Sequence, residues 1–167
     1  MRRIAFILPA SAGLGLALFL LTVPALASDI PNERATLKGL KAVNVAAERI
    51  DPEAEKDGLT KSQLQTDVES RLRQAGINVD HLSDEYLYVT VNTLKGERGV
   101  YSYSVHVELH QSVMLVRDPK IIYYGAATWS LGRLGTVGSG HLREVREDVA
   151  ALVDQFINAY LEQNPKQ

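Results

Sequence analysis

Residues 101–115 read YSYSVHVELHQSVML, and this stretch decides the fold. Apolar and polar side chains alternate along it, which is typical of a strand with one buried face and one face in water. Residues 86–92, YLYVTVN, show the same alternation, and the segment 95–99 between the two stretches holds two glycines that suit a hairpin turn. The pair predicts an antiparallel sheet that is covered on one side only.

A third strand is expected over 122–131, after a turn at 117–120. Polarity sets its register, because a slip by one residue would turn every side chain to the other face. The expected pairs are Leu109 with Trp129, Val107 with Leu131, Glu108 with Ser130 and His110 with Thr128. In the first hairpin the expected pairs are Tyr88 with His106 and Tyr86 with Glu108. The aromatic side chains expected in the core are Tyr101, Tyr103, Tyr123 and Trp129.

Two helices complete the predicted domain. The first has a capping box of Thr60 and Gln63, and a glycine at position 76 suits its end. The second is expected over about 20 residues, because apolar residues from Leu142 to Leu161 follow helical spacing. With a short first strand within 40–50, the order is strand, helix, three antiparallel strands, helix. This order predicts an α+β fold, a two-layer sandwich with the helices on one face of the sheet.

The chain begins with an export signal. A basic start, an apolar run over 4–23 and the triplet Ala25, Leu26, Ala27 predict cleavage near Ala27. The alternative is an uncleaved anchor, since about 20 apolar residues span a bilayer. We therefore expect a signal peptide at 1–27, a flexible leader at 28–39, one domain at 40–162 and a tail at 163–167. The segment 51–58 is expected to be a solvated loop, and the protein is expected to be periplasmic or secreted.

Composition narrows the classes of function. Removing Arg2 and Arg3 from the 18 basic residues leaves 16 against 20 acidic ones, a net charge of about −4. This balance argues against nucleic acid, whose phosphates are bound by clustered Lys and Arg. The chain has no cysteine, which excludes disulfides, thiolate metal sites and a lipid-modified cysteine. No cofactor motif and no catalytic motif is recognisable, so a non-enzymatic role is expected.

The polar face of the sheet is the first candidate site. His106, Glu108 and His110 occupy alternate positions of one strand and so project from one face. The candidate binding face comprises Tyr86, Tyr88, His106, Glu108, His110, Thr128 and Ser130. Exposed aromatic residues with polar neighbours suit a protein or glycan contact, and a pair that merely stabilises the sheet is the alternative.

His106 and His110, with Glu108 between them, are also candidate Zn²⁺ ligands, with His81 or Tyr88 as a possible further ligand. The alternative is a set of solvated polar residues.

The glycine-rich segment 132–140 is the second candidate site. It precedes the last helix and predicts a flexible loop whose candidate residues are Gly135, Gly138, Ser139 and Gly140. Glycine loops at helix starts can hold anions, but this segment lacks the ending of a P-loop. A loop that simply connects the sheet to the helix is the alternative.

The mature chain resembles small bacterial envelope proteins. The stretch RLRQAGINV after the capped helix, the three-stranded meander and the long last helix are similar to accessory lipoproteins of lipopolysaccharide assembly and lipid transport. ATWSLG and FINAYLEQNPK are similar to stretches of uncharacterised exported bacterial proteins. The missing cysteine departs from the lipoproteins. The resemblance implies a non-catalytic binding or assembly accessory protein of the cell envelope.

Three hypotheses follow for the partner. The first is an envelope protein, lipid or glycan bound by the polar sheet face or the glycine segment. The second is a metal-binding protein or metal-dependent enzyme that uses the His-x-Glu-x-His strand. The third is a homo-oligomer formed through an exposed strand edge. Contact with a membrane is expected only if the signal stays uncleaved.

Overall fold

A computed structural model describes residues 31–165 of the chain, so the predicted signal peptide lies outside the described residues. The elements are α1 (Pro31–Ala35), β1 (Asn44–Ala47), α2 (Pro52–Lys56), α3 (Lys61–Gln74), β2 (Tyr86–Lys95), β3 (Val100–Leu115), β4 (Asp118–Gly138) and α4 (Arg143–Gln163), with 3₁₀ turns at Glu97–Gly99 and Ser139–His141. Among the described residues, no helix is long and apolar enough to cross a membrane.

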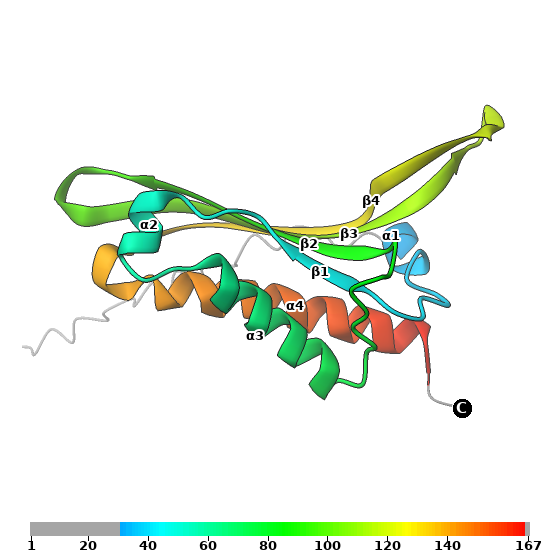
Figure 1. Ribbon diagram of the computed structural model, residues 1–167, viewed down its shortest axis with the longest axis horizontal. Coiled ribbons are helices and arrows are strands. Elements are labelled where there is room, and N and C mark those ends of the chain that lie inside the picture. The colour runs from blue at the N-terminus through cyan, green and yellow to red at the C-terminus, as the bar shows by residue number, and fades with distance from the viewer. Residues whose placement is uncertain (1–30, 166–167) are drawn as a thin grey trace, which may run out of the picture.

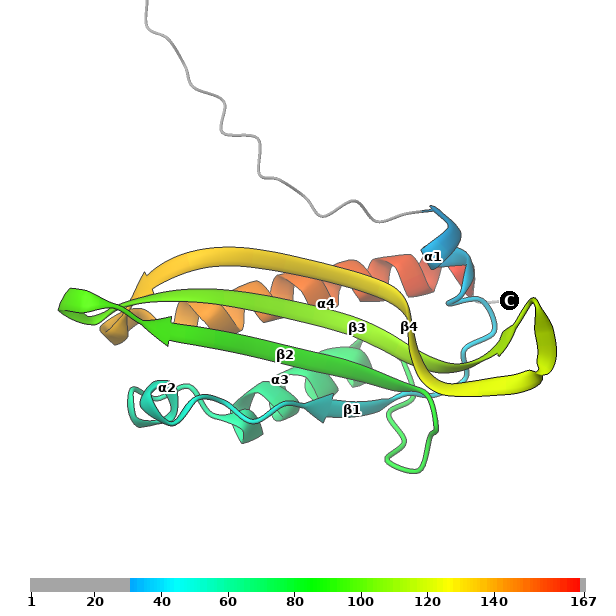
Figure 2. The same cartoon turned by 90° about the horizontal axis from the view of Figure 1, so that it is seen from above.

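The four strands form one sheet in the order β1-β2-β3-β4. β1 runs parallel to β2, whereas β2, β3 and β4 form an antiparallel meander. α3 and α4 lie side by side against one face of the sheet, and the other face is free of helices (Figures 1 and 2). We call the free face the outer face. The predicted α+β class and its two layers are confirmed.

The core lies between the sheet and the two long helices. The inward side chains of β3 are all buried from Tyr101 to Leu109, and Trp129 of β4 meets Phe156 of α4 edge to face, with ring centroids 5.1 Å apart. Burial of this kind contributes roughly 25 cal/mol per Å² of apolar surface. The alternation along residues 101–109 therefore fixes which face of the sheet the helices cover.

α3 begins and ends as its sequence predicts. The Thr60 side chain accepts a hydrogen bond from the Gln63 backbone, and the Gln63 side chain accepts one from the Thr60 backbone. At the other end Gly76 has φ of 82°, and the Ile77 amide donates to the Leu72 carbonyl at 2.9 Å. Both ends are thus closed by local interactions.

The register of the meander is confirmed in one hairpin and shifted in the other. Leu109 pairs with Trp129, Val107 with Leu131 and Glu108 with Ser130, as expected, but a bulge after Leu109 pairs His110 with Ala127 and not with Thr128. In the first hairpin Tyr88 pairs with Glu108 and Tyr86 with His110, two residues away from the predicted register. The reason is the turn, where Arg98 and Gly99 both have positive φ and set the loop one residue later than expected. A shift of two leaves every side chain on its predicted face.

Three segments predicted to be irregular are ordered. Residues 31–39 are no flexible leader, because Leu37 is fully buried and α1 packs near the end of α4. Residues 52–56 form α2, whose first turn is capped by the Asp51 carboxylate at 2.8 Å from the Glu53 amide. The predicted tail from 163 is tied down, since the Asn164 side chain bonds the Leu37 carbonyl and the Gly39 amide at 2.9 and 2.8 Å.

α1 covers the open edge of β4. The Glu33 carboxylate accepts a hydrogen bond from the Ser130 amide at 3.3 Å, and the Thr36 hydroxyl donates to the Thr128 carbonyl at 3.3 Å. These two bonds satisfy backbone groups that an edge strand would otherwise offer to another chain. The strand edge predicted as a route to oligomers is therefore blocked at this point.

Candidate functional site

Four side chains of the outer face form a packed group, which we call the tyrosine–histidine cluster: Tyr86, Tyr88, Glu108 and His110. β2 and β3 place them together because Tyr86 pairs with His110 and Tyr88 with Glu108. The Tyr86 ring stacks on the His110 ring with centroids 4.9 Å apart, and Tyr88 meets His110 edge to face at 5.6 Å. Each member of the cluster is half-buried. The cluster is a compact aromatic surface and not four separate solvated side chains.

Hydrogen bonds hold the His110 ring in place. Its Nε2 lies 3.1 Å from the Glu108 carboxylate, and its Nδ1 lies 2.9 Å from the Gly125 carbonyl oxygen and 3.3 Å from the Tyr86 hydroxyl. Whichever ring nitrogen carries hydrogen therefore has an acceptor within reach. Because ring stacking and hydrogen bonds act together, the cluster presents one fixed shape to the outside.

Tyr88 stays a neutral hydroxyl over the ordinary pH range. Burial raises the pKa of Tyr88 above its usual value, and the nearby carboxylate of Glu48 adds to this shift. The hydroxyl can both donate and accept a hydrogen bond. The cluster thus offers a partner aromatic faces, a phenol group and a carboxylate.

The other predicted residues of the face lie outside the cluster. His106 pairs with Thr90 and with Gly132, so it lies along the strand beyond Glu108. Thr128 donates to the Gln111 side chain at 2.7 Å, and the Ser130 amide bonds Glu33 of α1. The predicted face is therefore divided: four of its residues pack together, and the remaining three border them.

The predicted metal site is not assembled. Within residues 31–165, no three His, Cys, Asp or Glu side chains lie close enough to hold one metal ion. The physical reason is the strand itself, which rises about 3.4 Å per residue and so sets His106 and His110 roughly 13 Å apart. Glu108 bonds His110 and leaves His106 aside. The His-x-Glu-x-His strand is thus no chelate.

The glycine-rich segment is a strand and not a loop. β4 runs through it to Gly138, and only Ser139 and Gly140 fall in the 3₁₀ turn before α4. Gly135 lies opposite Tyr103, and a Cβ at this position would collide with the Tyr103 ring and hydroxyl. The glycine therefore makes room for a tyrosine across the strands, and the prediction of a flexible connection is wrong for Gly135 and Gly138.

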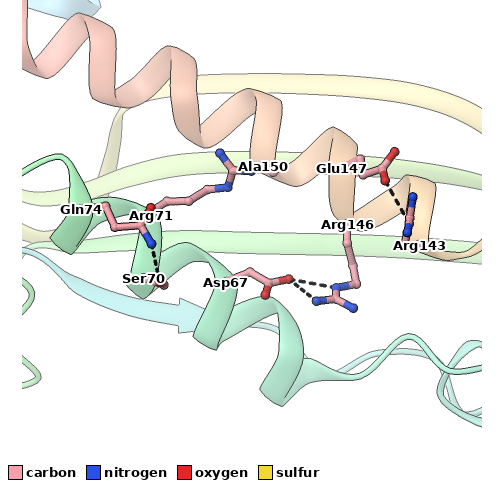
Figure 3. Close-up of a pocket in the computed structure, with 8 residues that line it drawn as sticks. All are labelled: Asp67, Ser70, Arg71, Gln74, Arg143, Arg146, Glu147 and Ala150. Carbon is pink, nitrogen blue, oxygen red and sulfur yellow. Dashed lines mark hydrogen bonds and ion pairs between the residues drawn. The ribbon is translucent and has the colours of Figure 1, made fainter.

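An open cleft between α3 and α4 is a feature that sequence analysis missed (Figure 3). It has a volume of about 570 Å³, and it is lined by Asp67, Ser70, Arg71, Gln74, Arg143, Arg146, Glu147 and Ala150. Its arginines are already paired: Arg146 with Asp67 at 2.7 Å, Arg143 with Glu147 at 3.1 Å, and Arg71 with Asp154 at 2.8 Å. The cleft thus has no spare positive charge to attract an anion. Two of these pairs, Arg146–Asp67 and Arg71–Asp154, join α4 to α3 across about 80 positions of sequence, so no local pattern could have revealed them.

The second missed feature is a hairpin arm at the β3–β4 turn, which we define as residues 112–125. Figure 1 shows it rising from the end of the sheet on the side away from the helices. Two register shifts between Gln111 and Leu115, together with the positive φ of Gly125, bend the strands here. The large exposed apolar side chains of the arm are Met114, Val116, Ile121, Ile122, Tyr123 and Tyr124. Tyr123 is therefore not the core residue that the alternation predicted.

Comparisons with known proteins give only loose likenesses. No protein-family model matches the chain, and no curated protein matches its sequence. A solved PelC dodecamer from Paraburkholderia phytofirmans is 18% identical, with a TM-score of 0.40, over 75% of this chain and 88% of that chain. A minor lipoprotein from Acinetobacter baumannii is 13% identical, with a TM-score of 0.35, over 71% of this chain and 88% of that chain. At these identities and TM-scores the two structures carry no inference about the family or the function of this chain.

Proposed function

We propose that the protein is a non-catalytic binding or assembly accessory protein of the bacterial cell envelope and that it contacts its partner through the outer face of its sheet. The observation that carries the proposal is the tyrosine–histidine cluster, in which stacked rings and hydrogen bonds fix an aromatic surface on the face that no helix covers. A surface that is already ordered loses little conformational entropy when a partner binds. The export signal predicted at residues 1–27 would place this surface outside the cytoplasm.

The chemistry of the cluster defines the partner that would fit. Tyr86 and Tyr88 offer ring faces and hydroxyl groups, and Glu108, opposite Tyr88, offers a carboxylate. Such a combination suits a polar partner with flat apolar portions, either a glycan or a protein surface. A lipid headgroup is the further class to be tested.

The test places a photo-crosslinking phenylalanine analogue at position 88 and, as a matched control, at position 92. Asn92 belongs to the same strand and the same outer face, and it lies outside the cluster. On illumination of intact cells, we expect one specific adduct from position 88 and none from position 92. Mass spectrometry of the adduct then identifies a protein, a glycan or a lipid.

A second variant links the adduct to the cluster. Tyr86→Ala removes the ring that stacks on His110 and should reduce the yield at position 88 at least fivefold, while circular dichroism reports an unchanged fold. Absence of any adduct at position 88, or equal adducts at both positions, would overturn the proposal.

A further inference from the structure

The arm has apolar side chains on both of its faces. Successive residues of a strand point to opposite faces, so the neighbours Ile121 and Ile122, and likewise Tyr123 and Tyr124, place exposed side chains on both sides of the ribbon. Val116 at the tip is 99% exposed and Tyr124 is 75% exposed. A monomer rarely leaves such a continuous apolar surface in water, and surfaces of this kind mark sites of interaction.

A second apolar surface lies at the opposite end of the sheet. Leu94, Val100 and Leu134 are exposed there, with Leu94 at 73% and Leu134 at 81%. The register places them on the outer face: Leu94 pairs with Ser102 and Leu134 with Ser104, so the short serine side chains lie between the two leucines. We call Leu94, Val100 and Leu134 the far-end patch.

The two surfaces cannot meet within one chain. β3 starts at the far-end patch with Val100 and ends in the arm with Leu115, and its 16 residues are continuous. At about 3.4 Å per residue, the two ends of this strand lie on the order of 50 Å apart. Any contact between the arm and a far-end patch must therefore join two molecules.

The charges of the two ends are complementary. The arm tip carries Arg117 and Lys120 against one acid, Asp118, and neither basic side chain has an ion-pair partner among the described residues. At the other end, α2 lies beside β2 (Figure 2) and exposes Glu53 and Glu55 against one base, Lys56; the two glutamates likewise have no ion pair within residues 31–165. A net positive tip on a chain of net negative charge would be drawn to this acidic end, and more strongly at low salt.

We infer that the protein associates head to tail with a second copy of itself, the arm of one molecule lying on the far-end patch of the next with its basic tip near α2. Because the two surfaces differ, each molecule keeps one arm and one patch free after the first contact. Such a heterologous interface builds a closed ring when the rotation between copies allows it and an open chain otherwise. The inference goes beyond the proposed function and does not depend on it, since the tyrosine–histidine cluster takes no part in the contact.

Sedimentation velocity of the exported protein, over a hundredfold range of concentration, tests the inference. We expect association beyond the dimer for the wild type. Val116→Asp in the arm and Leu134→Asp in the far-end patch should each raise the dissociation constant at least tenfold. Leu82→Asp is the matched control, because Leu82 is 90% exposed and belongs to neither surface. A mixture of the two defective variants should form dimers that do not grow, since one intact arm and one intact patch remain.

Charge exchange tests the direction of the contact. Arg117→Glu with Lys120→Glu should weaken association, and Glu53→Lys with Glu55→Lys in the same chain should restore it. A wild type that stays monomeric, or an association that Val116→Asp abolishes and Leu134→Asp leaves intact, would overturn the inference. Flotation of monomeric protein with anionic lipid vesicles through the arm would overturn it as well, because lipid would then be the occupant.

Discussion

The roles of several residues in this protein depend on the side chains that face them across the sheet or from α4, and not on their neighbours in the sequence. The Tyr103 hydroxyl donates to the Asp148 carboxylate of α4 at 2.6 Å, and Arg133 pairs with the same carboxylate. Gly135 is opposite Tyr103 and leaves room for its ring. In a sequence, glycine usually indicates a loop. Here Gly135 lies within a strand and makes room for the Tyr103 ring, whose hydroxyl bonds Asp148 of α4.

The first prediction at the residue scale concerns Tyr103→Phe. Burial, and then the hydrogen bond to Asp148, raise the pKa of Tyr103 to about 12. A group whose pKa is higher in the folded state contributes stability that is present below its unfolded value, near 10, and lost as the pH rises toward 12. We expect the variant to be about 1 to 2 kcal/mol less stable than the wild type at pH 8. The difference should shrink between pH 10 and pH 12.

Urea unfolding at several pH values, followed by circular dichroism, checks this. Tyr124→Phe is the control, because that ring is exposed on the arm and its hydroxyl should not affect the midpoint. A constant difference between Tyr103→Phe and the wild type up to pH 12 would show that the hydroxyl is not buried against Asp148.

At the scale of the elements, local rules are sufficient only where the stabilising interactions are local. The capping box of Thr60 and Gln63 and the left-handed Gly76 lie within the helix they close, so the sequence predicts α3 correctly. Residues 31–39 are different, because this segment is held by Asn164 and Glu162 at the other end of the chain. No pattern within a polar segment of nine residues reveals a partner 125 positions away.

The difference between local and long-range interactions also explains which part of the candidate site the sequence predicts. Alternation places the members of the tyrosine–histidine cluster on the outer face, and a slip of two residues in the hairpin does not alter that face. Which residue stacks on His110 depends on the turn, however, and the positive φ of Arg98 is not what its residue type predicts. The arm is missed for a related reason, since the alternation of residues 101–115 continues past Leu109, where the helical layer ends.

The prediction at the element scale is that Leu37→Ala destabilises the domain. Leu37 lies in the segment that the sequence predicts to be a flexible leader, and it is fully buried in the structure. Removing a buried leucine side chain costs about 2 to 5 kcal/mol, because contacts are lost and a cavity remains. Urea unfolding measures the loss, with Leu82→Ala as the control on an exposed leucine. Equal stability of Leu37→Ala and the wild type would mean that this segment is the mobile leader that its sequence indicates.

At the scale of the whole molecule, the protein consists of a packed domain and an arm that adds nothing to the core. Within the described part of the chain, no apolar residue between Leu109 and Trp129 is buried, and the arm lies in this interval. What the arm contributes is surface, and an unpartnered ribbon with two apolar faces is costly in water unless it serves a contact. The proposed association would thus use a different part of the sheet from the part that folding uses.

The last prediction separates these two roles. Replacing residues 112–125 by Asn-Gly joins Gln111 to Ala126, which are already paired, through a two-residue turn that suits a hairpin. The core is untouched, and His110 loses its contact with the Gly125 carbonyl but keeps those with Glu108 and Tyr86. We therefore expect unfolding to stay cooperative and the free energy of unfolding to change by no more than about 1 kcal/mol. Sedimentation velocity should then find only monomers at every concentration at which the wild type associates. A shortened protein that unfolds at much lower urea would show that the arm supports the domain, and one that still associates would show that the contact lies elsewhere.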